Sequence, residues 1–412
     1  MITNIRAKNF KSWKDTGDLR IAPLTGFFGA NSSGKTSLLQ MLLMLKQTAE
    51  SSDYRLALHL GDKNSLVELR TFYDIVTNHQ INEALELSFS WQSRMLANLL
   101  AAYTDKQSES PILDVNFTVK FREISKIVVV DSFKYEFGDY SFGIKRKTDT
   151  SFDYEFEGDF NLNGQESHAG PVKFYNFATN FTSNEMFFLM RLPAELSDQL
   201  TQIVYLGPLR DYPQPIYIWA GDTPTDVGAK GERAISAMLA SKINNWGLEE
   251  MIAAQLRKMG LIHSFSLEPI APGRRDYEVK IKKTSTSPEV LITDVGFGVS
   301  QILPVLVLCY YVPEHSTIIL EQPEIHLHPS VQADLADVLI DVVKNRNIQI
   351  ILESHSEYLL HRIQRRIAEE QLTPDDTTLY FCEMGEDGAS TATPLQLDKY
   401  GNIANWPKDF FG

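Results

Sequence analysis

The 412-residue sequence lacks the features of a membrane-spanning or secreted protein. Its longest apolar run, Ile302 to Val312, has 11 residues, which is too short to span a bilayer and predicts a buried helix. The first residues contain no apolar core of the kind that signal peptides have. The two cysteines, Cys309 and Cys382, lie among apolar residues without the spacing of a metal site. We therefore expect reduced thiols, no membrane partner and a cytoplasmic location.

Positive charge is also scarce. The net charge is −14, whereas proteins dedicated to nucleic-acid binding usually carry a basic surplus. Any contact with DNA would therefore be local. Short basic runs of this kind are more typical of solvated surfaces than of DNA sites. The candidates are residues 144–147, 273–275, 280–283 and 361–366.

Heptad repeats are absent, which argues against a long coiled-coil arm. Instead, strand-like and helix-like stretches alternate toward the carboxyl end, which predicts an α/β fold with a parallel sheet. Short, aromatic-rich alternating stretches between residues 115 and 163 predict an antiparallel meander. We also expect two helices between Glu232 and Gly260, and a strand over Val290–Gly296.

A phosphate-binding loop is the strongest motif. Gly29 to Thr36 reads "GANSSGKT", follows a short apolar stretch and precedes an apolar helix. Glycines let backbone N–H groups surround phosphate oxygens, and the start of the helix favours negative charge. In this pattern Lys35 reaches the β- and γ-phosphates, and Thr36 offers a hydroxyl to Mg²⁺.

An acidic strand end follows later in "TIILEQPEIHLHP", Thr317 to Pro329. A carboxylate at Glu321 can hold Mg²⁺ directly or through water. Gln322 occupies the position where a general base would orient water. Its amide forms hydrogen bonds but cannot accept the proton.

Two further segments fit the same chemistry. Asp294 to Leu303 reads "DVGFGVSQIL", in which small residues open an apolar helix, and a helix start of this kind can bind an anion. His355 in "ESHS" comes directly after another apolar stretch. Taken alone, a glycine-rich turn into a helix more often has a structural role than a functional one. A lone histidine after a strand is more often a core or capping residue.

The order of these motifs resembles the ABC-type ATPase heads of the SMC, RecF and OLD group, which are often described as AAA ATPases in bacteria. The opening "IRAKNFKSW" also resembles the first strand and turn of that group. The resemblance implies a P-loop ATPase head with an antiparallel β-rich subdomain and a helical subdomain. We expect an amino-terminal ATPase lobe over residues 1–95, an inserted meander and mixed region over 96–200, and a carboxyl-terminal ATPase lobe with an extension over 201–412.

The resemblance also implies ATP and Mg²⁺ as cofactors and two heads that enclose two ATP molecules. The metal would be held by Thr36 and Glu321, the catalytic group would comprise Glu321, Gln322, Glu324 and His355, and Gln80 is a candidate for the Q-loop. The implied nucleotide contacts are Lys11, Ser12, Gly29, Asn31, Ser32, Ser33, Gly34, Lys35, Thr36 and Ser37, and from the partner head Gly296, Gly298, Ser300 and Gln301.

Gln322 departs from the group's pattern, and three accounts remain open. The subfamily is built this way, with Glu324 or His355 helping to position water. Alternatively the protein hydrolyses ATP slowly and acts as an ATP-held clamp. The third account is a deliberate Glu-to-Gln exchange that traps ATP.

Three functions are compatible with these motifs. The first is a slow ATP-dependent switch that dimerises or oligomerises and regulates a separate effector, a nuclease or toxin, in bacterial anti-phage defence. The second is a RecF-like, DNA-binding repair ATPase, and the third is a scaffold that binds nucleotide without hydrolysing it. Only 57 residues follow His355, too few for the nuclease domain of OLD proteins, so we expect any cutting to come from a partner.

Overall fold

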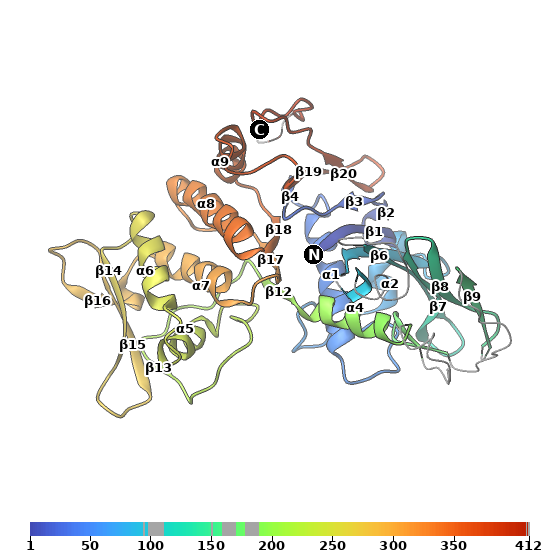
Figure 1. Ribbon diagram of the computed structural model, residues 1–412, viewed down its shortest axis with the longest axis horizontal. Coiled ribbons are helices and arrows are strands. Elements are labelled where there is room, and N and C mark those ends of the chain that lie inside the picture. The colour runs from blue at the N-terminus through green and yellow to red at the C-terminus, as the bar shows by residue number, and fades with distance from the viewer. Residues whose placement is uncertain are drawn as a thin grey trace. The chain divides into compact units, whose positions relative to one another are not determined.

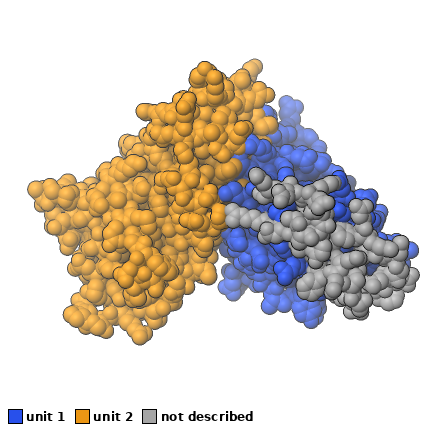
Figure 2. Space-filling model, in the orientation of Figure 1, with its two compact units in different colours: residues 1–22, 30–203, 382–393 blue, residues 23–29, 204–381, 394–412 orange. Residues whose placement is uncertain are grey.

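The computed structural model describes residues 1–93, 95–97, 111–149, 151–158, 170–177, 189–408 and 410. The chain forms two compact units, and each is assembled from separate segments (Figure 2). Unit 1 contains residues 1–22, 30–203 and 382–393, and unit 2 contains residues 23–29, 204–381 and 394–412. The predicted division into three regions stays a prediction.

Unit 1 is built around an antiparallel sheet with the strand order β2-β1-β5-β6-β7-β8-β9, and β3 pairs with the other part of β1 (Figure 1). The predicted meander is confirmed as far as Glu157, whereas its residues 159–163 lie outside the described residues. Its first strand pairs with β5, so it continues the sheet that β1 begins. The strands are β1 (Ile2–Phe10), β2 (Trp13–Asp15), β3 (Leu19–Arg20), β5 (Leu85–Gln92), β6 (Ile112–Arg122), β7 (Ile127–Phe137), β8 (Tyr140–Arg146) and β9 (Phe152–Glu157).

Alternation of side chains explains this sheet. Along β6, buried residues such as Val115, Phe117 and Val119 are separated by more exposed polar ones, as expected for a strand with one buried face. Helix α1 is predominantly apolar and packs with α4. The remaining elements of unit 1 are α1 (Lys35–Glu50), α2 (Phe72–Ile75), η1 (Thr77–His79), β10 (Pro171–Val172), β11 (Asn176–Phe177) and α4 (Arg191–Thr201).

The main sheet of unit 2 has the order β12-β17-β18-β4-β19-β20. Residues 382–393, which contain the end of β19, the turn after it and most of β20, belong to unit 1. β4, β18 and β17 are parallel, which confirms the predicted α/β class. Their residues are almost all buried, as is usual for parallel strands covered on both faces. The strands are β12 (Ile203–Leu206), β4 (Leu24–Gly29), β17 (Thr317–Glu321), β18 (Gln349–Glu353), β19 (Thr377–Met384) and β20 (Ser390–Pro394).

Helices accompany this sheet and a smaller antiparallel one. α8 (Pro329–Arg346) packs against α9 (Glu357–Ala368) and against β18 (Figure 1). The two predicted helices after Glu232 are confirmed as α5 (Ala234–Ile243) and α6 (Leu248–Lys258), which pack together and against α7 (Phe297–Tyr311). The smaller sheet contains β13 (Tyr217–Ile218), β15 (Asp276–Lys282), β14 (Ser264–Pro269) and β16 (Glu289–Leu291).

Most sequence-based elements agree with the structure, with one correction. The strand expected over Val290–Gly296 is wrong beyond Leu291, because Ile292–Asp294 forms a 3-10 turn that leads into α7. The buried helix expected at Ile302 is confirmed, and Cys309 and Cys382 are both fully buried. Within the described ranges, the helices are either too short or too polar to cross a bilayer.

Candidate nucleotide-binding site

The loop of the "GANSSGKT" motif begins where β4 ends at Gly29, and α1 starts at Lys35. Three of its residues have left-handed backbone angles: φ is 134° at Gly29, 63° at Ser32 and 89° at Gly34. Such a conformation turns successive N–H groups toward one side, which makes an anion-binding concavity. The backbone therefore fits the phosphate-binding role that the sequence predicts.

Gly34 is required by its packing in unit 1. A Cβ atom on this residue would lie 2.5 Å from Ser390 Oγ and 2.9 Å from Ser12 Oγ. Ser390 donates a hydrogen bond to Ser12 Oγ at 2.7 Å, and Trp13 Nε1 donates to the Gly34 carbonyl at 3.1 Å. The structure thus brings the predicted residue Ser12 to the loop. It adds Ser390, which the sequence did not indicate.

Lys35 is held inside the loop. Its ammonium donates to the Ala30 carbonyl at 2.6 Å and to Ser33 Oγ at 3.4 Å, and the residue is only 2% exposed. Thr36 follows it in the first turn of α1, so an ammonium and a hydroxyl, the groups that suit phosphate and Mg²⁺, are adjacent.

The other predicted nucleotide contacts differ in their surroundings. Lys11 donates to Gln40 on α1, and burial lowers the pKa of Lys11. Of the other predicted contacts, Asn31 and Ser32 are exposed, Ser37 is half-buried in α1, and Gln80 is an exposed residue after η1.

The acidic strand end lies in unit 2. β17 ends at Glu321, which pairs in register with Glu353 at the end of β18. Tyr205, in β12, donates its hydroxyl to Glu321 Oε2 at 2.6 Å. Burial, and then the neighbouring carboxylate, raise the pKa of Tyr205 well above its usual value, so it remains a donor. A half-buried carboxylate oriented in this way is a suitable oxygen ligand for Mg²⁺.

Gln322 has a strained backbone. Its φ of 45° lies in the left-handed region, which side chains other than glycine rarely adopt. Two backbone hydrogen bonds stabilise this conformation. Gln322 N–H donates to the Glu353 carbonyl at 2.9 Å, and Ile325 N–H donates to the Gln322 carbonyl at 3.2 Å. Residues held in such conformations cluster at functional sites.

Glu324 and His355 are brought together at the same edge of the unit 2 sheet. Glu324 Oε1 accepts a hydrogen bond from the His355 backbone N–H at 2.7 Å. Burial raises the pKa of Glu324, although the hydrogen bond from His355 and the charge of Arg210 oppose the effect. Arg210 and Tyr205 come from a segment that the sequence showed only as a strand end followed by a loop.

The segment from Asp294 to Leu303, here named the signature segment, leads out of the 3-10 turn and forms the start of α7. Gly296 precedes the helix and is exposed, as is Phe297, whereas Ser300 and Gln301 are buried. Ser300 Oγ donates to the Phe297 carbonyl at 2.9 Å. Gly296 and Gly298 have ordinary backbone angles, and a Cβ atom on either would meet no atom within 4 Å. The fold of the described chain therefore gives no reason for glycine at these positions.

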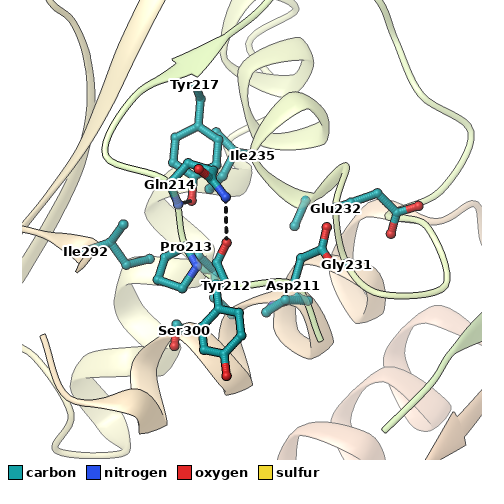
Figure 3. Close-up of a pocket in the computed structure, with 13 residues that line it drawn as sticks. Asp211, Tyr212, Pro213, Gln214, Tyr217, Gly231, Glu232, Ile235, Ile292 and Ser300 are labelled. Carbon is teal, nitrogen blue, oxygen red and sulfur yellow. Dashed lines mark hydrogen bonds between the residues drawn. The ribbon is translucent and has the colours of Figure 1, made fainter. Parts of the chain in front are cut away.

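Ser300 also lines a small pocket of about 70 Å³ within unit 2. Tyr212, Pro213 and Gln214, in the loop that follows Arg210, also line this pocket (Figure 3). Tyr212 packs edge-on against Phe297, with ring centroids 5.6 Å apart. This loop therefore runs from the acidic strand end to the signature segment.

All four basic runs contribute to ion pairs with nearby carboxylates. The partners lie at 3.3 Å for Lys147–Asp153, 3.1 Å for Arg274–Asp276, 3.0 Å for Lys280–Glu268 and 2.6 Å for Arg366–Asp337. Neighbouring negative charge weakens the positive potential that DNA binding requires. The described surface therefore does not strengthen the expectation of a DNA contact.

Comparison with known families agrees with this geometry. The sequence matches the AAA ATPase domain family over residues 1–181 and 239–360. The chain belongs to this family. The expected membership of an AAA-type ATPase group is confirmed, since the match contains both the phosphate-binding loop and the acidic strand. Residues 372–412 of this AAA ATPase domain protein match a second family, described as a protein of unknown function (DUF3696).

Solved structures of SMC heads are similar to this ATPase-domain chain. One is an Smc head bound to the C-winged helix domain of ScpA, with 14% identity, a TM-score of 0.49 and coverage of 97% of this chain and 98% of that chain. Another is the SMC head domain from Thermotoga maritima, with 11% identity, a TM-score of 0.41 and coverage of 96% and 99%. A third is an Smc head with an extended coiled coil, bound to the C-terminal domain of ScpA derived from Pyrococcus furiosus, with 12% identity, a TM-score of 0.42 and coverage of 97% and 97%. Likeness at this level establishes neither function nor partner. None of the curated proteins matches the sequence.

Proposed function

We propose that this protein is a slow ATP-hydrolysing switch. The observation that carries the proposal is the end of β17, where Glu321 is followed by Gln322 in a strained turn. A carboxylate at the first position suits Mg²⁺, but an amide at the second cannot accept a proton from water. Binding of ATP would then be retained while its hydrolysis is slowed.

In this proposal the loop from Gly29 to Thr36 holds the phosphates, with Lys35 as the cation among their oxygens. Thr36 and Glu321 would hold Mg²⁺, which neutralises charge that develops on the transferred phosphate. Chain order supports the grouping, since the loop directly follows β4, and β4 is parallel to β18 and β17. His355, which follows β18, would respond to the γ-phosphate.

We also propose that two copies enclose ATP through their signature segments. Glycine inside a helix is unfavourable, and Gly298 lies in the first turn of α7 without any steric need for it within the chain. Close approach of a phosphate and a second protein surface would supply that need. Closing on ATP and opening after hydrolysis would make a two-state switch, because the γ-phosphate contacts exist in one state only.

A separate effector in phage defence and a cytoplasmic location both stay predictions. A RecF-like role in repair also stays a prediction, and salt-dependent DNA binding by the purified protein would favour it.

Nucleotide binding by Lys35→Ala tests the proposal. We expect the parent to bind ATP with Mg²⁺ and to hydrolyse it slowly, and Lys35→Ala to weaken binding at least about 10-fold, because a charge-assisted phosphate contact is lost. Titration calorimetry and phosphate release measure the two properties.

Lys46→Ala is the matched control. Lys46 lies on the same helix and is also buried, but it pairs with Glu50 at 2.6 Å and donates to the Thr201 carbonyl at 3.0 Å. Its loss should lower stability and leave ATP affinity unchanged. Equal ATP affinity of the parent and Lys35→Ala would contradict the assigned site.

A further inference from the structure

Arg210 is a buried cation that its surroundings only partly satisfy. It follows β12, at the start of the loop that leads to β13, and is only 7% exposed. Its Nη2 donates a long hydrogen bond of 3.5 Å to the Gln322 carbonyl. Its Nε and Nη1 are buried and have no hydrogen-bond partner among the described residues. A buried guanidinium with unpaired N–H groups lowers the stability of the fold, so we expect it to have a function.

Glu324 is the complementary group. It is also 7% exposed, and its Oε1 accepts from His355 N–H while Oε2 is buried without a partner in the described part of the chain. Arg210 and Glu324 attract each other electrostatically, yet the unpaired atoms on both show that they do not meet directly. A small polar molecule between them would satisfy both, and water is the simplest candidate.

The position of Arg210 and Glu324 beside Gln322 suggests a role in ATP hydrolysis. Arg210 contacts the backbone of Gln322, the residue that stands where a base is expected, and Glu324 is the next carboxylate along the chain. We propose that Arg210 is a positioning residue for ATP hydrolysis, which keeps the Glu324 carboxylate ionised and oriented toward the attacking water. The inference rests on the proposed ATPase function.

Hydrolysis forms one bond to phosphorus and breaks another. The water oxygen forms a bond to the γ-phosphorus, and the bond from that phosphorus to the β–γ bridging oxygen breaks. ADP and inorganic phosphate are the products. The proton of the water passes to Glu324 Oε2 and then to solvent, so Glu324 is the base and Gln322 orients the water through its amide.

Electrostatics agree with this division of roles. Burial lowers the pKa of Arg210 to about 10, so its guanidinium remains charged at neutral pH. Burial raises the pKa of Glu324, whereas the Arg210 charge and the hydrogen bonds from His355 N–H and Ser354 lower it. Removal of Arg210 would therefore raise the pKa of Glu324 further, and the base would become active only at higher pH.

The test uses Arg210→Gln and Arg210→Lys in the full chain, with single-turnover hydrolysis, KM and ATP affinity measured from pH 5 to 9. For Arg210→Gln we expect the rate at neutral pH to fall about 100-fold, within the usual contribution of a general base. KM and ATP affinity should stay close to the parent values. The acidic limb of the rate profile should move to higher pH, and Arg210→Lys should restore it in part because it keeps the charge.

Arg346→Gln is the structural control. Arg346 is a partly buried arginine of unit 2 whose Nη1 and Nη2 donate to the Cys309 and Val312 carbonyls, both at 2.6 Å. Its replacement should lower the melting temperature and leave the rate and its pH profile unchanged. A further variant, Arg210→Gln with Glu324→Gln, should lose no more rate than the worse single variant, since the two groups act as a unit.

The outcomes separate the two proposals. If the parent hydrolyses no ATP, the proposed function fails and the role of Arg210 fails with it. If the parent is active and Arg210→Gln keeps its rate and pH profile, only the inference on Arg210 is overturned. It is also overturned if both Arg210 variants fail to fold, or if Arg210→Lys is folded and its rate and pH profile are no closer to those of the parent than the values for Arg210→Gln.

Discussion

In our proposal a single side chain, Gln322, makes ATP hydrolysis slow. Its backbone is held at φ 45° by hydrogen bonds to Glu353 and Ile325, so the side chain is presented from a rigid turn. The amide can orient water through hydrogen bonds but offers no basic site. In our proposal the proton acceptor is Glu324, whose burial raises its pKa.

The Gln322→Glu variant tests the hypothesis that the amide of Gln322 slows hydrolysis. We expect hydrolysis to accelerate at least about 10-fold, because a carboxylate in the water-positioning place adds general-base catalysis. Phosphate release under single-turnover conditions measures it, and ATP affinity should not change. Gln322→Ala is the control and should be slower than the parent. If the parent hydrolyses ATP at an ordinary rate and Gln322→Glu does not raise that rate, the hypothesis that Gln322 slows hydrolysis is contradicted.

At the scale of elements, α7 combines two roles. Its central part, from Val299 to Cys309, is fully buried and supports the core of unit 2. At its start Phe297 is exposed and Gly298 is half-buried, and a Cβ atom on Gly298 would meet no atom of the described chain within 4 Å. A helix start with this open space and an exposed apolar side chain, Phe297 at 48% exposure, is suited to contact a second surface.

Gly298→Ala should therefore separate stability from assembly. We expect the free energy of unfolding to rise by up to about 1 kcal/mol, since alanine is the better helix former. ATP-dependent dimerisation should weaken, because the added methyl group would obstruct the partner.

Denaturant unfolding and light scattering measure these two effects. Gly273→Ala is the control, because Gly273 has φ +77° and an open environment, so the change should destabilise the fold without affecting assembly. Unimpaired dimerisation of Gly298→Ala would remove the support for a close partner contact there.

At the scale of the whole molecule, the two compact units are interleaved along the chain. The break between Gly29 and Ala30 falls inside the phosphate-binding motif, so the loop belongs to unit 1 while the strand before it belongs to unit 2. Neither unit is therefore formed from one continuous stretch of the chain.

We expect the protein to be monomeric without nucleotide and dimeric with ATP and Mg²⁺. Light scattering after size exclusion should show twice the chain mass of 46.7 kDa only in the second case. Phe297→Arg should block the dimer and keep ATP affinity, since this side chain is exposed, whereas Ser300 is buried and its replacement would disturb α7. A dimer that forms equally without ATP, or with Phe297→Arg, would argue against an ATP-enclosed interface.

The sequence by itself determined the α/β class, the phosphate-binding loop, the acidic strand and their order. These depend on local chemistry: apolar alternation or runs define β1, β17 and β18, and the loop needs glycine and lysine at fixed spacing. The same local signals misassigned Val290–Gly296, where apolar residues continue past the end of β16 into a 3-10 turn.

Only the tertiary structure decided which distant residues support these motifs. Ser390 contacts Ser12 beside the loop across 378 positions, Tyr205 orients Glu321 across 116, and Arg210 reaches Gln322 across 112. No periodicity or spacing encodes such pairs, because they arise when strands far apart in the chain become neighbours in a sheet. The charge state of Glu324 likewise depends on burial, which the folded chain alone creates.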